Sequence, residues 1–397
     1  MIQSDHDALV EAHQRKRPAG PSTPSSRPGG AAPERSGKLP LMSIPTEPIG
    51  SIPRPPELIA AMGEVAAGRM APEEAASIAG EALRDTIARF EATGSPVITD
   101  GEQTKPSFAT YPIHGLDNLA PDGVTIPFAD GHTRQLPRLT AGPFRYRTRA
   151  ASYLEAARRY TGRPLKQAVI SASALSLLYP AEGIAAYPRE EFLADLVNEA
   201  EADIRGCLEA GAWVVQIDFT EARLAVKLDA SRGLLRQFVA LNNQVLARFS
   251  AAERQRIGVH TCPGGDQDST HSADVDYGDL LPDLFALDAG RFYLQLASEA
   301  DRRRVLGIIH RHARPEQLVF VGVIDPIDPR VETAEEVRDR VLEAADFIPL
   351  ERLGTTDDCG FSPFGDDTST GRDTAFAKIS ARVAGTQLAA RALGVQS

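Results

Sequence analysis

Short apolar runs alternate with longer amphipathic segments from Leu41 to the end of the chain. Several of the short runs are apolar at consecutive positions, which is typical of strands covered on both faces. This alternation indicates a parallel sheet built from repeated strand–helix units. The predicted strands are 97–99, 167–170, 213–217, 257–259, 292–296, 318–324 and 353–356, with a first strand expected near 44–50.

Two helices are well defined by the pattern. Apolar side chains recur at helical spacing between residues 190 and 210, and Gly211 follows as a stop signal. Thr333 and Glu336 form a capping-box pattern that predicts a helix over 333–346. Cys207 falls on the apolar stripe of the first helix, so we interpret it as a core residue.

Eight predicted strands that alternate with helices favour an α/β fold, a (β/α)8 TIM barrel. The Pro- and Gly-rich stretch 112–147 is expected to be an insertion in it. A doubly wound sheet remains the alternative, because counting strands does not establish closure. Residues 1–40 are rich in Pro, Gly and Ser and are expected to form a disordered tail. Residues 41–397 would then form the catalytic domain.

Composition narrows the possible functions. The 42% hydrophobic content is ample for a large core, and the net charge of −11 without a strong basic run argues against a nucleic-acid partner. Three cysteines do not make a disulfide framework, and the start of the chain lacks an apolar stretch like a signal peptide. The sequence contains no run of about 18 apolar residues, which a membrane span would need. We therefore expect a cytoplasmic protein.

Candidate metal ligands follow two of the predicted strands. His260 and Cys262 stand at i and i+2, so their side chains project to the same side of an extended segment. Cys359 follows the last strand, and the functional residues of a TIM barrel lie at these strand ends. Imidazole and thiolate suit zinc, and three protein ligands with an open position are typical of a catalytic zinc.

Such an ion would hold a small thiol substrate as a thiolate, which predicts nucleophilic substitution by sulfur. A non-catalytic zinc-binding barrel stays the alternative, because an isolated H-x-C pair is a weak motif. Polar side chains mark most of the other strand ends: Ser51, Asp100, Glu102, Ser171, Ser173, Asp218, Glu221, Gln295, Glu299, Asp325 and Asp328.

A set of short motifs resembles, in the same order, the catalytic barrel of the cobalamin-independent methionine synthase family. The segments are IGSIPRP (49–55), DGE (100–102), QID (216–218), HTC (260–262), GVIDPIDPR (322–330) and DDCGF (357–361). The resemblance covers residues 44 to 395. It implies a TIM barrel with a zinc ion, and methyl transfer to homocysteine giving methionine, as in 5-methyltetrahydropteroyltriglutamate–homocysteine methyltransferases.

Position by position, the resemblance makes His260, Cys262 and Cys359 the zinc ligands. It places Ser51, Glu102 and Asp218 at positions that bind the amino-acid part of homocysteine, where a carboxylate pair suits an ammonium group. Among the strand-end carboxylates, Asp218 and Asp325 are the expected catalytic residues. The implied partners are homocysteine and a methyl donor.

The sequence departs from the family at three positions. Gln295 stands where the family has a zinc-binding glutamate, so the fourth ligand is Gln295, Glu299 from the following loop, or absent. The tryptophan that stacks on folate has no counterpart, with Tyr179 the nearest aromatic residue. A histidine that acts as an acid beside folate corresponds to Ile327. The methyl donor is therefore left open.

Two related branches give alternative functions. Epoxyalkane:coenzyme M transferases share the zinc–thiolate chemistry, but a sulfonate-bearing thiol would favour Arg or Lys in the pocket, whereas Glu102 and Asp218 favour an amino-acid thiol. The uroporphyrinogen decarboxylase branch shares the barrel and needs no metal ligands. The three ligand candidates argue against it.

Overall fold

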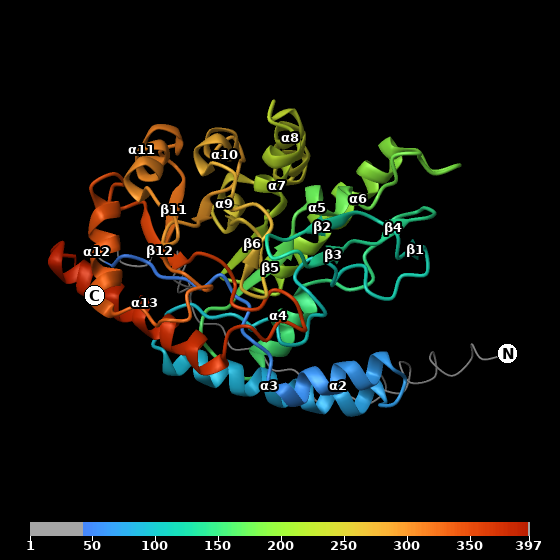
Figure 1. Ribbon diagram of the computed structural model, residues 1–397, viewed down its shortest axis with the longest axis horizontal. Coiled ribbons are helices and arrows are strands. Elements are labelled where there is room, and N and C mark those ends of the chain that lie inside the picture. The colour runs from blue at the N-terminus through green and yellow to red at the C-terminus, as the bar shows by residue number, and fades with distance from the viewer. Residues whose placement is uncertain (1–42, 396–397) are drawn as a thin grey trace, which may run out of the picture. The chain divides into compact units, whose positions relative to one another are not determined.

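Six parallel strands form the central sheet, in the order β12-β11-β10-β7-β6-β5. Figure 1 labels β5, β6, β11 and β12 of this sheet. The structure is a computed structural model and describes residues 43–395, so the predicted tail at 1–40 lies outside the described residues. Every residue of β5, β6, β7 and β12 is buried, as expected for strands covered on both faces. The strands are β5 (Lys166–Ile170), β6 (Val214–Asp218), β7 (Ile257–Thr261), β10 (Arg291–Leu294), β11 (Leu318–Ile324) and β12 (Leu353–Asp357).

The first two predicted strands close this sheet into a barrel, but only through single bridges. Thr46 pairs in parallel with Thr355 of β12, and Ile98 pairs in parallel with Leu165 next to β5. The two segments meet where Ile52 N donates to the Gly101 carbonyl at 3.0 Å. The prediction of full strands at 44–50 and 97–99 was wrong. In the first segment, Pro45 and Pro48 lack an N–H for the ladder. The predicted (β/α)8 barrel is confirmed, and the doubly wound alternative is excluded.

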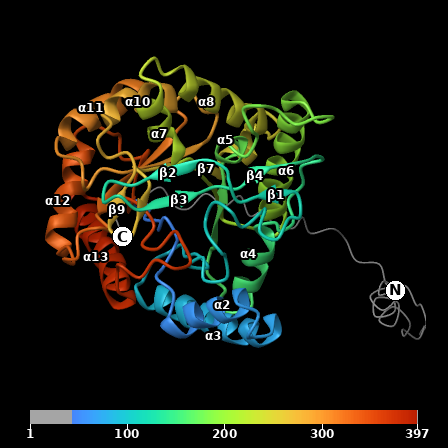
Figure 2. The same cartoon turned by 45° about the vertical axis from the view of Figure 1, so that its right-hand side comes forward.

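Helices surround the barrel in a ring (Figure 2). Both predicted helices are present: α6 begins at Arg189, and α12 begins with the complete capping box of Thr333 and Glu336. Cys207 in α6 is fully buried in the core, as expected. The helices are α2 (Pro56–Ala66), α3 (Pro72–Ala92), α4 (Ala151–Arg158), α5 (Ala172–Ser176), α6 (Arg189–Glu209), α7 (Glu221–Leu228), α8 (Gly233–Leu246), α9 (Ala251–Arg254), α10 (Tyr277–Leu284), α11 (Arg302–His312), α12 (Ala334–Ala345) and α13 (Arg372–Ala392).

The stretch 112–147 is an insertion that carries four short strands: β1 (Leu119–Ala120), β2 (Thr125–Pro127), β3 (Thr133–Gln135) and β4 (Arg138–Leu139). β2 and β3 pair with each other, β1 pairs with β4, and the β2–β3 hairpin lies across the ring of helices (Figure 2). A second small hairpin, β8 (Gly265–Asp266) and β9 (Ser269–Thr270), follows β7. The two hairpins touch where Ala129 N donates to the Thr270 carbonyl at 3.0 Å.

Across the part of the chain that the structure describes, no helix combines the length and apolar character needed to cross a membrane. The division into a tail at 1–40 and a barrel domain at 41–397 stays a prediction.

Candidate functional site

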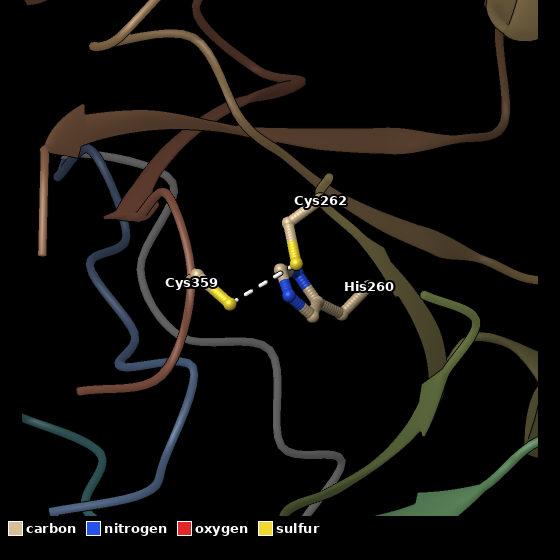
Figure 3. Close-up of side chains that lie close together, drawn as sticks. All are labelled: His260, Cys262 and Cys359. Atoms are coloured by element: carbon tan, nitrogen blue, oxygen red, sulfur yellow. Dashed lines mark hydrogen bonds between the residues drawn. The ribbon is translucent and has the colours of Figure 1, made fainter. Parts of the chain in front are cut away.

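The three predicted metal ligands meet at the carboxyl ends of the strands. His260 lies in β7, Cys262 follows that strand directly, and Cys359 comes two residues after β12. β10 and β11 separate the two strands in the sheet, so closure of the barrel brings these residues together. Their ligand atoms all lie within 4.8 Å of one another, and the two sulfur atoms are 3.0 Å apart. The three side chains point toward one another (Figure 3).

The chemistry of this cluster fits a metal ion. The Nδ1 atom of His260 lies 3.3 Å from the Tyr293 carbonyl, so an Nδ1–H can donate there and leave Nε2 with a free lone pair. Nε2 is buried and has no hydrogen-bond partner among the described residues. The backbone N–H of Gly264 lies 3.4 Å from the Cys262 sulfur, a contact that suits a thiolate. A buried nitrogen without a partner, facing two sulfurs, is satisfied by a shared cation.

Without a metal, the pair of cysteines disfavours ionisation. The hydrogen bond between the two thiols and burial raise the pKa of the Cys359 thiol well above its usual value. Two buried thiolates side by side repel each other, so a bound cation would be needed to hold both in the charged form.

The neighbouring loops are held close to this cluster. The Asp358 carboxylate accepts hydrogen bonds from the backbone N–H groups of Leu296, Ala297 and Ser298, each at 2.8 Å, which fixes the loop after β10. Gly264 has a φ of +72°, and a Cβ there would lie 1.8 Å from Nε2 of His271. Glycine fits best at this turn, which explains Gly264.

Arg223 engages both candidates for a fourth ligand in this structure. The Arg223 guanidinium donates to Oε1 of Gln295 at 2.8 Å and to Oε1 of Glu299 at 3.0 Å. The Gln295 amide also donates to Ser298 Oγ at 2.6 Å. The group of His, Cys, Asp and Glu side chains that converges here contains His260, Cys262 and Cys359 and does not include Glu299. Buried Arg223 thus engages both side chains.

The three predicted substrate-binding residues lie beside the cluster. Ser51, Glu102 and Asp218 line one small cavity together with His260 and Cys359. Oδ1 of Asp218 accepts from the Gln216 amide at 2.7 Å, and burial raises the pKa of Asp218 to about 6. Glu102 has a φ of 55°, an uncommon conformation for a residue other than glycine. The loop after β12 approaches Ser51 so closely that a Cβ on Gly360 would lie 2.1 Å from Ser51 Oγ.

Asp325 lies in an adjacent hollow, apart from that cavity. It lines this hollow with Gln295, Ile327 and Cys359. Its carboxylate accepts from the backbone N–H of Ile327 at 3.0 Å, and burial raises the pKa of Asp325. The two expected catalytic carboxylates, Asp218 and Asp325, therefore flank Cys359 from different sides of the site.

Two buried cations of the site, Lys105 and Arg223, were not predicted from the sequence. Lys105 donates to Oε1 of Glu102 at 2.9 Å and to the Ala168 carbonyl at 2.9 Å. The i, i+3 spacing in DGEQTK was a signal for this ion pair. Arg223 had no such signal, because its partners Gln295 and Glu299 lie more than 70 residues away along the chain. Lys105 therefore pairs with Glu102, and Arg223 engages Gln295 and Glu299.

Comparison with known proteins adds evidence from outside the structure. Residues 44–370 match the family model described as "Cobalamin-independent synthase, Catalytic domain". A 5-methyltetrahydropteroyltriglutamate–homocysteine methyltransferase of Streptomyces griseus subsp. griseus is 26% identical over 84% of this chain and 41% of its own length. One from Nitratidesulfovibrio vulgaris is 24% identical over 81% of this chain and 39% of its own length. The chain thus spans about two fifths of the length of these curated relatives.

Two solved structures share the fold over nearly their whole length. A B12-independent methionine synthase from Shewanella sp. W3-18-1, in complex with selenomethionine, aligns with a TM-score of 0.69 and 19% identity, covering 89% of this chain and 99% of that chain. A putative vitamin-B12 independent methionine synthase from Listeria monocytogenes aligns with a TM-score of 0.64 and 21% identity, covering 87% and 98%. Similarity at this level of identity supports the barrel fold.

Proposed function

Since the chain belongs to the family of cobalamin-independent synthase catalytic domains, we propose that it transfers a methyl group from a small-molecule donor to the thiol of homocysteine, giving methionine. One observation carries the proposal: the cluster of His260, Cys262 and Cys359 opens into the cavity that Ser51, Glu102 and Asp218 line. A thiol at the cluster and an amino-acid group at the carboxylates can therefore belong to one substrate. The cytoplasmic location of the protein stays a prediction.

The metal at this cluster is proposed to be zinc, held by the imidazole of His260 and the thiolates of Cys262 and Cys359. When bound, the ion supplies a Lewis acid that lowers the pKa of a substrate thiol, as it does for bound water. The donor set supports zinc, because mixed imidazole and thiolate ligands with an open position are typical of its catalytic sites. We propose no fourth protein ligand.

The chain's own side chains would orient the substrate. Oδ1 of Asp218 is engaged by Gln216, which leaves Oδ2 for the ammonium of homocysteine, next to Glu102. The hydroxyl of Ser51 lines the same cavity and suits the substrate carboxylate as a donor. Among the described residues, those that line this cavity include no Arg or Lys side chain. This absence disfavours a sulfonate-bearing thiol such as coenzyme M.

In the transfer step, a sulfur–carbon bond forms as the bond between the methyl carbon and the donor atom breaks. The electron pair of the broken bond stays on the donor atom, which then takes up a proton. We propose that Asp325 serves this proton transfer, because it lies in the hollow beside Cys359 and burial favours its protonated form. Buried walls around the thiolate exclude competing water.

Binding of homocysteine should release about one proton per chain, since a thiol that is protonated at neutral pH becomes a metal-bound thiolate. Titration calorimetry in two buffers with different ionisation enthalpies measures this number directly. Protein stripped of metal by a chelator is the control and should release none. Binding without proton release from the metal-loaded protein would contradict activation of the thiol.

The ligand set has a separate test. Because Arg223 and Ser298 hold the amide of Gln295, Gln295→Ala should keep its zinc and retain an unchanged visible spectrum when loaded with cobalt(II). Gln317→Ala removes another buried glutamine, whose amide donates to Phe285 and Leu287 carbonyls far from the cluster, and controls for lost stability. Loss of metal in Gln295→Ala alone would show that Gln295 is a ligand.

A further inference from the structure

A large cavity of about 670 Å³ lies next to the thiol site. The two spaces adjoin, because they share four lining residues, Phe108, Thr220, Gly264 and Gly265. Its size falls within the range of about 300–1,000 Å³ typical of small-molecule sites. Most of the wall is apolar and includes Phe108, Phe128, Leu136, Ile170 and Leu224.

One carboxyl group stands out in this apolar wall. Glu221, the first residue of α7, is 5% exposed and lines the cavity. Its Oε1 accepts hydrogen bonds from the hydroxyls of Ser171 and Ser173, each at 2.5 Å. Its Oε2 is buried and has no partner among the described residues. A buried carboxyl oxygen without a partner costs free energy, unless a ligand satisfies it.

The pair of serines fixes the direction of this group. Asn242 donates to Ser173 Oγ at 2.7 Å, and Ser171 Oγ accepts from Ala174 N at 3.0 Å, so both hydroxyls are free to donate to Glu221. Burial raises the pKa of Glu221 to about 7, against the lowering effect of the two hydroxyls. The two hydroxyls occupy Oε1, whereas Oε2 has no hydrogen-bond partner among the described residues.

The lining offers no free cation within the described residues. Arg134 is its only Arg or Lys, and the guanidinium pairs with Asp266 at 2.5 Å and with Asp366 at 2.9 Å. Burial lowers the pKa of His271 to about 4, so its imidazole is neutral near pH 7. The charged groups of the wall therefore disfavour an anionic ligand and favour one that donates hydrogen bonds.

We propose that this cavity binds the methyl donor and that Glu221 selects it: a compact, largely apolar, uncharged or cationic molecule whose N–H group donates to Oε2. The inference rests on the proposed function for the role of the ligand, and on the cavity itself for its chemistry. This preference for an uncharged or cationic donor would distinguish the chain from its curated relatives. Their name specifies a triglutamate carrier, which is a polyanion. Glu221 thereby acts as a specificity-determining residue for the second substrate.

Binding of three bicyclic probes to the full chain at pH 8.5, where Glu221 is charged, tests this proposal by calorimetry. 2-Aminoquinoline has an N–H donor, 2-methylquinoline has the same shape without it, and 2-naphthoate is an anion of similar size. We expect 2-aminoquinoline to bind at least about tenfold more tightly than either of the others, since a charge-assisted hydrogen bond in a buried site gives this difference. In Glu221→Gln, which retains shape but loses the charge, the preference over 2-methylquinoline should fall to about twofold or less.

Two further variants keep the result interpretable. Glu221→Asp keeps the charge on a side chain one methylene shorter, so its preference for 2-aminoquinoline should be intermediate. This variant replaces Glu221→Gln if the latter fails to fold. Ala174→Phe fills the cavity from α5 and should weaken all probes alike, which shows that they bind there. Equal affinity of the three probes, an unchanged preference in Glu221→Gln, or binding insensitive to Ala174→Phe would each overturn the proposal. The probes need neither metal nor homocysteine, so failure of the proposed methyl transfer would leave this result intact.

Discussion

Replacing Cys262 or Cys359 by serine should remove the metal and reduce homocysteine methylation by about a thousandfold or more. Each sulfur is one of three converging ligand atoms, and a hydroxyl is a far poorer zinc ligand than a thiolate. Without the ion, the substrate thiol ionises only near its own pKa of about 8.5 and is not held beside the donor. Metal analysis of the purified variants, with methionine formation as the second readout, measures both effects.

The third cysteine provides a matched control for this experiment. Cys207 lies in α6, fully buried and outside the cluster, so Cys207→Ala should lower the unfolding temperature slightly and keep about one zinc per chain. Wild-type protein that purifies in its active form without any metal would contradict the proposed chemistry. So would a Cys359→Ser variant that retains full activity.

Asp218→Asn should weaken homocysteine binding by about a hundredfold while leaving the metal in place. Oδ2 of Asp218 is the oxygen that Gln216 does not engage, and neutralising the carboxylate leaves the substrate ammonium without its partner in a buried cavity. Losing one member of a buried charge pair costs about 3–5 kcal/mol, part of which water recovers in an open cavity. The ratio of KM values for variant and wild type measures the loss.

A thiol without the ammonium separates this effect from general damage. 4-Mercaptobutanoate has the chain length of homocysteine and lacks the amino group, so its KM should differ little between wild type and Asp218→Asn. Asp203→Asn is the matched control, because Asp203 is a buried carboxylate in α6 that accepts from Tyr111 and from Ala150 N, outside the cavity. An equal loss of affinity for both thiols in Asp218→Asn would argue against recognition of the ammonium.

The elements of the barrel could be predicted well because the signals are local. The apolar run at 318–324 is β11 over the same residues, and the capping box of Thr333 and Glu336 begins α12 where its pattern placed it. The metal cluster was predictable for a similar reason. His260 and Cys262 share a side of one extended segment, and the parallel strands of a barrel carry their functional residues at one face.

The predictions that failed or stayed open depended on distant partners. The first segment reads as a strand near 44–50, yet its prolines limit it to one bridge with β12, some 300 residues further along the chain. The role of Gln295 could not be deduced from its own strand, since Arg223 of α7 engages the amide. The sequence pattern identified Glu221 only as a polar residue at a strand end. The residues next to it in the sequence did not indicate its hydrogen bonds with Ser171 and Ser173.

Which residues can bind a metal, and at which strand ends they stand, could be predicted from residue type and periodicity, because both are properties of short segments. The pairing of these groups depends on the tertiary structure. Closure of the barrel brings Cys359 to 3.0 Å from Cys262, engages Gln295 with Arg223, and leaves one oxygen of Glu221 without a partner beside a large cavity. Hydrogen bonds and ion pairs act over a few ångströms in space, whatever the separation along the chain, so the pattern along the sequence does not encode them.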